Sequence, residues 1–230
     1  MRDLLAKFSI IAIDGTAASG KSTVGAALAQ RLGYLFFDTG VMYRAVTWAV
    51  LERNIEVHDI AQVSKLAELL VIDVTPDGED DGRQATVLVN GRDVTWEIRR
   101  PEVDQAVSQI SSYPRVRVAL TAQQRRIAAI GSIVMVGRDI GTVVLPEADL
   151  KIFMIASPQE RARRRYQDSI AQGYQANYNE ILAAIIERDE KDRTNPVSPM
   201  VPAHDAVIIE TDQLSVEAIL DKLEQLMERS

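Results

Sequence analysis

The sequence predicts an α/β fold in which a doubly wound, five-stranded parallel sheet is flanked by helices. Short apolar runs, rich in β-branched or aromatic residues, mostly lack polar alternation, which is typical of strands buried on both faces. These runs span residues 8–13, 34–37, 133–136, 151–155 and 207–209. Helical patterns lie between them, and a stretch with hairpin character interrupts the alternation. We therefore expect a parallel sheet that carries a small antiparallel β insertion.

Helices are indicated by apolar spacing and by capping residues. Val24, Leu28 and Leu32 recur every four residues, and Gly33 follows where a left-handed C-cap is needed. The segment 157–160 has the sequence Ser-Pro-Gln-Glu, which is typical of a capping box with proline in the first turn. We expect this second signal to open the helix that follows the fourth strand.

The insertion is predicted between residues 63 and 105. Residues 85–89 alternate in strand fashion, and Asn90-Gly91 follows them before a second strand-like run. An Asn-Gly pair between two such runs is typical of a type I′ hairpin. Because loops and insertions on such folds often carry function, we interpret this segment as a subdomain rather than a decoration. The whole chain, 1–230, is then one domain that contains this insertion.

Composition narrows the class of protein. The 230 residues are 47% hydrophobic, which is enough to bury a substantial core. The net charge of −7 argues against broad nucleic-acid binding, so an anionic ligand needs locally concentrated arginines. Cysteine is absent, which removes disulfides and thiolate chemistry. No targeting or membrane-spanning segment is visible, and we expect a cytoplasmic monomer with no membrane partner.

The segment that follows the first strand has the pattern G-x-x-x-x-G-K-[ST], the P-loop of nucleotide-binding proteins. It directly follows an apolar strand and directly opens the helix 21–32, as this motif requires. Its backbone N–H groups and the helix N-terminus form an anion site, Lys21 should reach the β- and γ-phosphates, and the Ser22 hydroxyl should bind Mg²⁺. The predicted nucleotide-binding residues are Gly15, Thr16, Ala17, Ala18, Ser19, Gly20, Lys21, Ser22 and Thr23.

A P-loop alone does not say what receives the phosphate. Polar motifs follow the second and third strands, at residues 38–44 and 137–141, on the sheet edge where ligands bind in this class of fold. Arginines at 161, 164 and 165 share one helix face, and Arg188 lies four residues before Asp192. A lone charge pair is usually only a solvated helix face. Several arginines at an edge already marked by a P-loop favour a phosphate clamp.

With these motifs in place, the sequence resembles the bacterial cytidylate kinases, a group of P-loop nucleoside monophosphate kinases, over essentially its whole length. The matching segments are Ile13-Asp14-Gly15 with the P-loop, 38–44, 91–95, 97–99, 108–109, 114–117, 137–146, 188–189 and Asp192. The resemblance implies in-line transfer of the ATP γ-phosphate, with Mg²⁺, to CMP or dCMP, giving CDP or dCDP. It also implies that the insertion belongs to a monophosphate-binding subdomain.

The resemblance also implies roles for residues that bind the acceptor nucleoside. Ser108, Arg117 and Asp139 would read the cytosine edge. Their chemistry suits it, since cytosine offers an amine donor to a carboxylate and two acceptors to a guanidinium. Arg188 and Asp192 would contact the acceptor ribose.

The phosphate-binding residues are implied in the same way. Arg44 and Arg138 would hold the acceptor phosphate, with Thr39 nearby. A helical lid, residues 157–178, would close on the donor phosphates through Arg164 and Arg165, with Arg161 near them. No side-chain nucleophile is needed, because the transfer depends on positioning and charge neutralisation. The implied catalytic set is Lys21, Arg138, Arg164 and Arg165.

The sequence departs from the family pattern at two positions. Val136 stands where the family usually has an acidic residue that helps to hold hydrated Mg²⁺, and Asn195 stands where it usually has a phosphate-binding arginine. Arg193 is near enough in sequence to replace that arginine only if the backbone aims it inward. We expect an active enzyme with an altered Km or Mg²⁺ dependence, and a catalytically weakened paralogue is the alternative.

Other acceptors and other classes of protein stay open at this point. A kinase for UMP, dephospho-coenzyme A or a non-nucleotide acid shares the fold but lacks support in the set Ser108, Arg117 and Asp139. A nucleotide-dependent switch protein is the alternative from a different class. The sequence has no guanine-reading Asn-Lys-x-Asp motif, which disfavours that alternative.

Overall fold

The computed structural model describes residues 8–76, 81–83, 85–171, 173–195 and 199–229. By its internal contacts the chain divides into two compact units. The first comprises the chain up to residue 34 together with residues 132–230, and the second comprises residues 35–131. None of the helices in the described ranges is both long and apolar enough to cross a lipid bilayer.

The main sheet has five strands in the order β2-β6-β1-β7-β8. In the first unit, β1 pairs in parallel with β6 on one side and with β7 on the other, and β7 pairs in parallel with β8. These strands are Ile10–Gly15 (β1), Leu35–Asp38 (β2), Ile133–Val136 (β6), Leu150–Ile155 (β7) and Val207–Glu210 (β8). The predicted parallel sheet is therefore confirmed, and its strands begin or end within two residues of the predicted runs.

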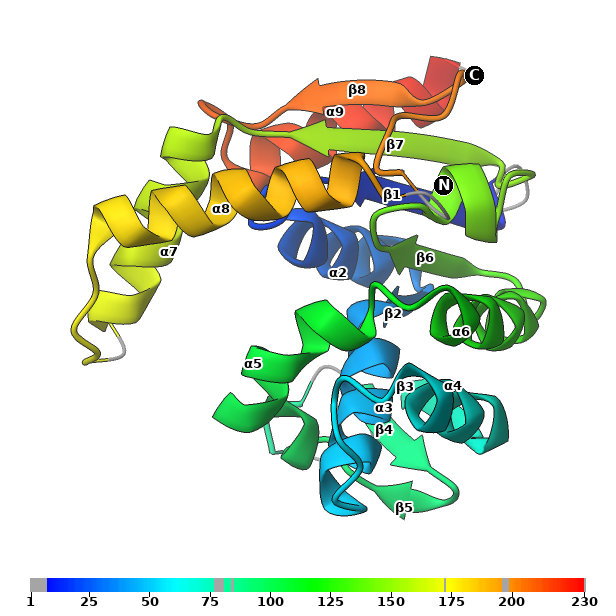
Figure 1. Cartoon of the computed structure of the whole chain (residues 1–230). Helices are drawn as coiled ribbons and strands as arrows, with labels where there is room; N and C mark the ends of the chain where they lie inside the picture. Colours follow the sequence, from blue (N-terminus) through cyan, green and yellow to red (C-terminus); the bar gives the residue numbers. More distant parts are fainter. Residues whose placement is uncertain (1–7, 77–80, 84, 172, 196–198, 230) are drawn as a thin grey trace. The chain divides into compact units, whose positions relative to one another are not determined.

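The α-helices described in the first unit are Lys21–Leu32 (α2), Val216–Arg229 (α9), Pro158–Ala171 (α7) and Tyr178–Arg193 (α8). Figure 1 shows α7 and α8 lying side by side. Helix α2 packs on β6 and on α9, and it ends at Gly33 in the predicted left-handed conformation (φ 69°). Val24 and Leu28 are buried on its inner face, as their spacing predicts.

The capping box at the start of α7 forms only in half. The Ser157 hydroxyl accepts a hydrogen bond from the backbone N–H of Glu160 at 3.2 Å, as predicted. The reciprocal bond is replaced, because the Ser157 N–H donates to Asp212 instead. The Glu160 carboxylate binds Arg163 and Arg164, which lowers the pKa of this carboxyl to about 2. Helix α7 is thus capped by a neighbouring loop as well as by its own serine.

The second unit contains the hairpin insertion within a set of helices (Figure 1). The helices are Gly40–Glu52 (α3), Ile60–Leu69 (α4), Pro101–Ile110 (α5) and Pro114–Ala128 (α6). The strands are Ile72–Pro76 (β3), Ala85–Val89 (β4) and Arg92–Asp93 (β5), and both pairings between them are antiparallel. Asn90 and Gly91 have φ angles of 50° and 81°, as a type I′ turn requires, so the predicted hairpin is confirmed.

Candidate active site

The loop between β1 and α2 has the backbone of an anion site. Ala18 and Gly20 adopt positive φ angles of 60° and 94°, and the Ser19 N–H donates to the Thr16 carbonyl at 3.3 Å. Alternation of left- and right-handed residues turns successive N–H groups toward one concavity, and the helix N-terminus adds its positive end. The Lys21 ammonium donates to the Thr16 carbonyl at 2.5 Å, so it lies over the loop. This arrangement can hold the phosphates of a nucleotide.

A cavity of about 510 Å³ adjoins this loop inside the first unit. Ser19, Gly20 and Thr23 form one wall, and Arg164 forms part of another. The Arg164 guanidinium donates to the Thr211 carbonyl at 2.7 Å, and its Nη1 lies 3.9 Å from the position of a Cβ added to Gly20. The structure therefore places this predicted lid arginine directly beside the phosphate loop, whereas Arg165 is exposed on the same helix.

Arg161 differs from the two arginines that follow it. Its side chain is 2% exposed and makes a bidentate ion pair with Asp189 of α8. The same guanidinium donates to the carbonyls of Ala17 in the phosphate loop and Ala156 at the end of β7. With its donors directed at these oxygens, Arg161 serves to join the loop to α7 and α8 rather than to face a ligand.

The arginine that follows β6 is brought together with the acidic end of α8. Arg138 forms an ion pair with Asp192, and the same carboxylate lies 3.9 Å from the guanidinium of Arg188. Three residues predicted to bind the acceptor thus form one cluster in the first unit. Two guanidinium groups thus lie at one carboxylate, and guanidinium is the side chain best suited to bind phosphate oxygens in a fork.

Asp14 is a buried carboxylate at the start of the phosphate loop, with 4% of its surface exposed. Its oxygens accept the N–H groups of Ile140 and Gly141, each at 2.7 Å. Burial raises the pKa of this carboxyl from 3.8 to about 6. The two backbone hydrogen bonds and Lys21 act in the opposite direction, and the nearby Asp139 adds to the increase.

The raised pKa of Asp14 predicts a pH-dependent stability. The folded protein binds a proton on Asp14 below about pH 6, whereas the unfolded chain binds it only near pH 4. Between these values the folded state holds more protons, so the free energy of unfolding falls as pH rises, by about 3 kcal/mol in total. Asp14→Asn removes this titration. Urea unfolding should therefore show the wild type losing about 2 kcal/mol of this relative to the variant from pH 4 to 7. A constant difference, or a gain with pH, would contradict this.

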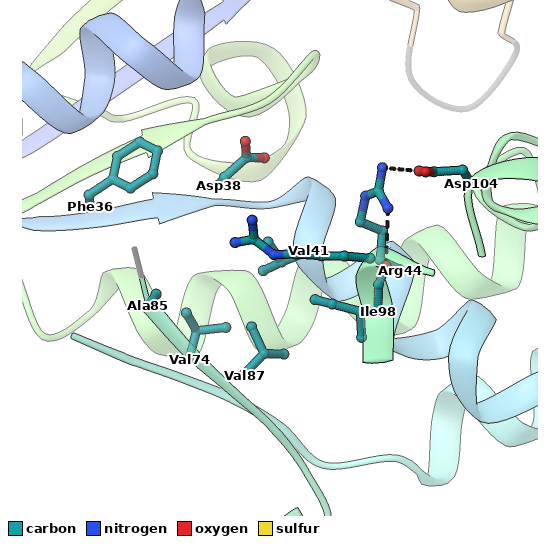
Figure 2. Close-up of a pocket in the computed structure, with 10 residues that line it drawn as sticks. Phe36, Asp38, Val41, Arg44, Val74, Ala85, Val87, Ile98 and Asp104 are labelled. Atoms are coloured by element: carbon teal, nitrogen blue, oxygen red, sulfur yellow. Dashed lines mark hydrogen bonds and ion pairs between the residues drawn. The ribbon is translucent and has the colours of Figure 1, made fainter. Parts of the chain in front are cut away.

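A second cavity, of about 370 Å³, lies wholly inside the second unit. Apolar side chains from β2, α3, β3 and β4 line most of it, and Figure 2 shows Val41, Val74 and Val87 among them. Charged side chains also line it, namely Asp38, Arg44, Arg99 and Asp104. The Arg44 guanidinium forms an ion pair with Asp104 and donates to the Ile98 carbonyl at 3.0 Å (Figure 2). A cavity in which apolar side chains lie beside placed arginines is typical of a site for an organic anion.

The other predicted acceptor residues of the second unit lie on its helices. Thr39 is buried at the start of α3, and Ser108 is exposed on α5. The Arg117 guanidinium stacks over Tyr43 at 5.4 Å and donates to the Ser111 carbonyl at 3.2 Å. This places Arg117 next to the connection between α5 and α6. The predicted acceptor residues thus belong to both units: Arg138, Asp139, Arg188 and Asp192 to the first, and Thr39, Arg44, Ser108 and Arg117 to the second.

The two departures from the family pattern have clear structural settings. Val136 is the last residue of β6 and lies beside Ile13 of β1, with 1% of its surface exposed. It presents no carboxylate next to the phosphate loop. Arg193 is exposed and paired with Glu190 one helical turn earlier, so in this structure it does not replace the arginine that the family has at the position of Asn195.

Three residues that organise the site received no role from the sequence. Asp104, Thr211 and Asp189 fix Arg44, Arg164 and Arg161 respectively. The Thr211 hydroxyl also donates to the Ser19 carbonyl of the phosphate loop at 3.1 Å. Each pairing joins residues 28 or more positions apart, so no local spacing could reveal it. The available signals were the arginines themselves and, for Asp189, its place in the matching segment 188–189.

Comparison with known proteins places this arrangement in a family. The family model described as cytidylate kinase matches residues 11–229. A cytidylate kinase of Chloroflexus aggregans is 53% identical over 89% of this chain and 87% of its own length. One from Roseiflexus castenholzii is 51% identical over 92% of this chain and 90% of its own. An uncharacterized protein from Eubacterium ventriosum, 12% identical, aligns over 97% of this chain and all of its own with a TM-score of 0.52, a likeness of fold alone.

Proposed function

Because the chain belongs to the cytidylate kinase family, we propose that it transfers the γ-phosphate of ATP to CMP or dCMP, giving ADP and CDP or dCDP. The observation that carries the proposal is the family match across residues 11–229, which includes both the phosphate loop and the segment 137–141. Relatives named cytidylate kinase, about half identical over most of the chain, support the same acceptor. The phosphate loop and its adjoining cavity suit the donor.

The donor phosphates would be held by the loop N–H groups and by Lys21, with Mg²⁺ bound by the Ser22 hydroxyl and by the nucleotide itself. Among the described residues there is no cluster of three or more His, Cys, Asp or Glu side chains that could hold a metal. Mg²⁺ commonly keeps several waters and binds through substrate phosphates, so a donor set limited to one hydroxyl fits a metal that arrives with ATP. The ion would neutralise charge on the transferring phosphoryl group.

The acceptor would be bound by the residues that the family resemblance assigns to it. Asp139, Ser108 and Arg117 would read the cytosine, and Arg188 with Asp192 would contact the ribose. The two arginines Arg44 and Arg138, with Thr39, would hold the monophosphate. An oxygen of that phosphate is already an anion, so attack on the γ-phosphorus requires alignment rather than a strong base. Arg164 and Arg165 would balance the charge that develops, and lid closure would exclude water.

The assignment of Asp139 to the cytosine edge predicts a change in base preference. Asp139→Ala should lower kcat/KM for CMP by about tenfold or more and lower kcat/KM for UMP less. The reason is that UMP lacks the exocyclic amine that would donate a hydrogen bond to the Asp139 carboxylate. Steady-state assays with each monophosphate at saturating Mg·ATP measure this ratio. Asp221→Ala, which removes an exposed carboxylate on α9, is the matched control and should leave both values unchanged. Equal losses for CMP and UMP would refute the assignment.

A coupled assay over the four nucleoside monophosphates, combined with an Mg²⁺ titration, tests the function itself. We expect ADP formation that depends on CMP or dCMP. A preference for UMP or for a non-nucleotide acceptor, or no turnover at all, would replace the proposal with another kinase or a weakened paralogue. The buried Val136 leads us to expect a higher Mg²⁺ requirement than in relatives with an acidic residue there. The cytoplasmic location and monomeric state stay predictions.

A further inference from the structure

Asp14 stands between the two loops that carry the predicted donor and acceptor residues of the first unit. It is the last residue of β1 before Gly15, which ends the strand and begins the phosphate loop, so its backbone leads directly into that loop. Its side-chain carboxylate accepts hydrogen bonds from the N–H groups of Ile140 and Gly141, and these two residues directly follow Arg138 and Asp139. A single residue therefore contacts both loops, one through its backbone and the other through its carboxylate.

The turn that receives Asp14 is held at several points. Its entrance is fixed by the Gly137 N–H, which donates to the Ile13 carbonyl at 3.0 Å. A single π-helical turn, Ile140–Val144, then closes when the N–H groups of Val143 and Val144 both donate to the Asp139 carbonyl. The backbone around Asp139 is thus constrained from both sides, and the two Asp14 hydrogen bonds tie it to β1.

There is little room for this turn to move away from Asp14. A Cβ added to Gly141 would lie 3.2 Å from the Cδ of Lys151 and 3.4 Å from the Asp14 carboxylate. Lys151 is itself buried on β7, and its ammonium is fixed by Asp205 at 2.8 Å. The turn is therefore packed between a carboxylate on β1 and a lysine stem on β7.

The two hydrogen bonds that the side chain of residue 14 accepts require a carboxylate. Two N–H donors reach two different oxygens of Asp14, and an ionised carboxyl accepts both in charge-assisted hydrogen bonds. An asparagine has one acceptor oxygen, so its amide N–H₂ would face one of the two backbone N–H groups. With both oxygens engaged and 4% of the residue exposed, Asp14 is not placed to bind the nucleotide or its metal.

We propose that Asp14 is a positioning residue for the reaction, which sets Arg138 and Asp139 relative to the phosphate loop by holding the turn after β6. The proposal rests on the proposed function only for its catalytic consequence, since the hydrogen bonds themselves do not depend on the substrate. Asp14→Asn releases the turn while keeping the size of the side chain. The acceptor is then misaligned, whereas the loop that binds ATP keeps its own backbone hydrogen bonds.

The kinetic test compares the two substrates. In Asp14→Asn, KM for CMP should rise by about tenfold to a hundredfold and the preference for CMP over UMP should shrink, while KM for ATP changes less than about threefold. Asp149→Asn is the matched control, because this carboxylate also accepts a backbone N–H of β1, from Ile10 at 2.8 Å, at the far end of the strand. The control should leave both constants unchanged. A fall in kcat with unaltered KM values and base preference would reduce Asp14 to a purely structural residue and overturn the proposal.

A second readout does not need activity. Amide hydrogen exchange, followed by NMR, should be at least tenfold faster at Ile140 and Gly141 in Asp14→Asn than in the wild type, with Ser19 and Val24 of the donor side little changed. Unchanged exchange at Ile140 and Gly141 would overturn the proposal. If the wild type fails to phosphorylate CMP, the proposed function falls, and the exchange rates still decide whether Asp14 holds the turn.

Discussion

Replacing Lys21 with methionine lowers kcat for phosphoryl transfer by about 10³-fold, the largest catalytic effect we expect from a single substitution. Its ammonium lies over the phosphate loop, on the Thr16 carbonyl. In the proposed function it is the loop's own cation for the β- and γ-phosphates. The Val136 side chain, buried at the end of β6, carries no polar group. Methionine keeps the length and apolar character of the stem, so the helix that Lys21 opens should form unchanged.

Steady-state kinetics with Mg·ATP and CMP measures this loss, and thermal unfolding shows whether the variant is folded. Lys222→Met on the exposed side of α9 is the matched control, with the same chemical change away from the loop. It should retain wild-type kcat. A Lys21→Met enzyme with more than about a tenth of wild-type turnover would show that the loop backbone alone carries the phosphates.

Gly15→Ala produces the largest loss of stability that we expect. Gly15 has a φ of 142°, and a Cβ at this position would lie 1.9 Å from the Met154 carbonyl oxygen on β7. That atom is backbone in the paired neighbouring strand, so relief requires β1 and β7 to separate. Overpacking of this kind, added to an unfavourable backbone conformation, costs on the order of 3 kcal/mol or more.

Urea unfolding of Gly15→Ala measures this cost against a control at another left-handed glycine. Gly33 has a φ of 69°, and a Cβ added there would meet no heavy atom within 4 Å. Gly33→Ala should therefore lose only about 1 kcal/mol, from backbone conformation alone. Similar losses for the two variants would mean that the close approach of β1 and β7 does not constrain the chain.

The parts of the fold that the sequence predicted are those encoded by contiguous residues. The strand before the phosphate loop, the helix Lys21–Leu32 and the Asn90-Gly91 turn each depend on local spacing and backbone conformation. Side-chain pairings that join distant segments were not predictable in this way. The Asp14 carboxylate meets the Gly141 N–H across 127 positions, and nothing near Asp14 indicates that partner.

Arginine positions show the same limit within the candidate site. Helical spacing placed Arg161, Arg164 and Arg165 on one face, yet one is buried against Asp189, one lies beside the phosphate loop, and one is exposed. Spacing fixes a direction around the helix axis, whereas the depth of each side chain depends on what packs there. The capping box shows the same limit. Its local hydrogen bond, from the Glu160 N–H to the Ser157 hydroxyl, formed as predicted, whereas the Ser157 N–H donates to the distant Asp212 instead of to Glu160.

The ion pair between Arg44 and Asp104 has a consequence for the entry of the acceptor. An arginine already neutralised by a carboxylate does not offer a free charge, so a phosphate that binds there must take the place of one anion with another. The net free energy of phosphate binding at Arg44 is then the difference between the arginine–phosphate interaction and the ion pair with Asp104 that it replaces. A dianionic monophosphate can release Asp104 in this exchange, whereas an unphosphorylated nucleoside brings no charge to do so. In the proposed acceptor pocket, this pair would screen ligands by the phosphate they carry before the base is read.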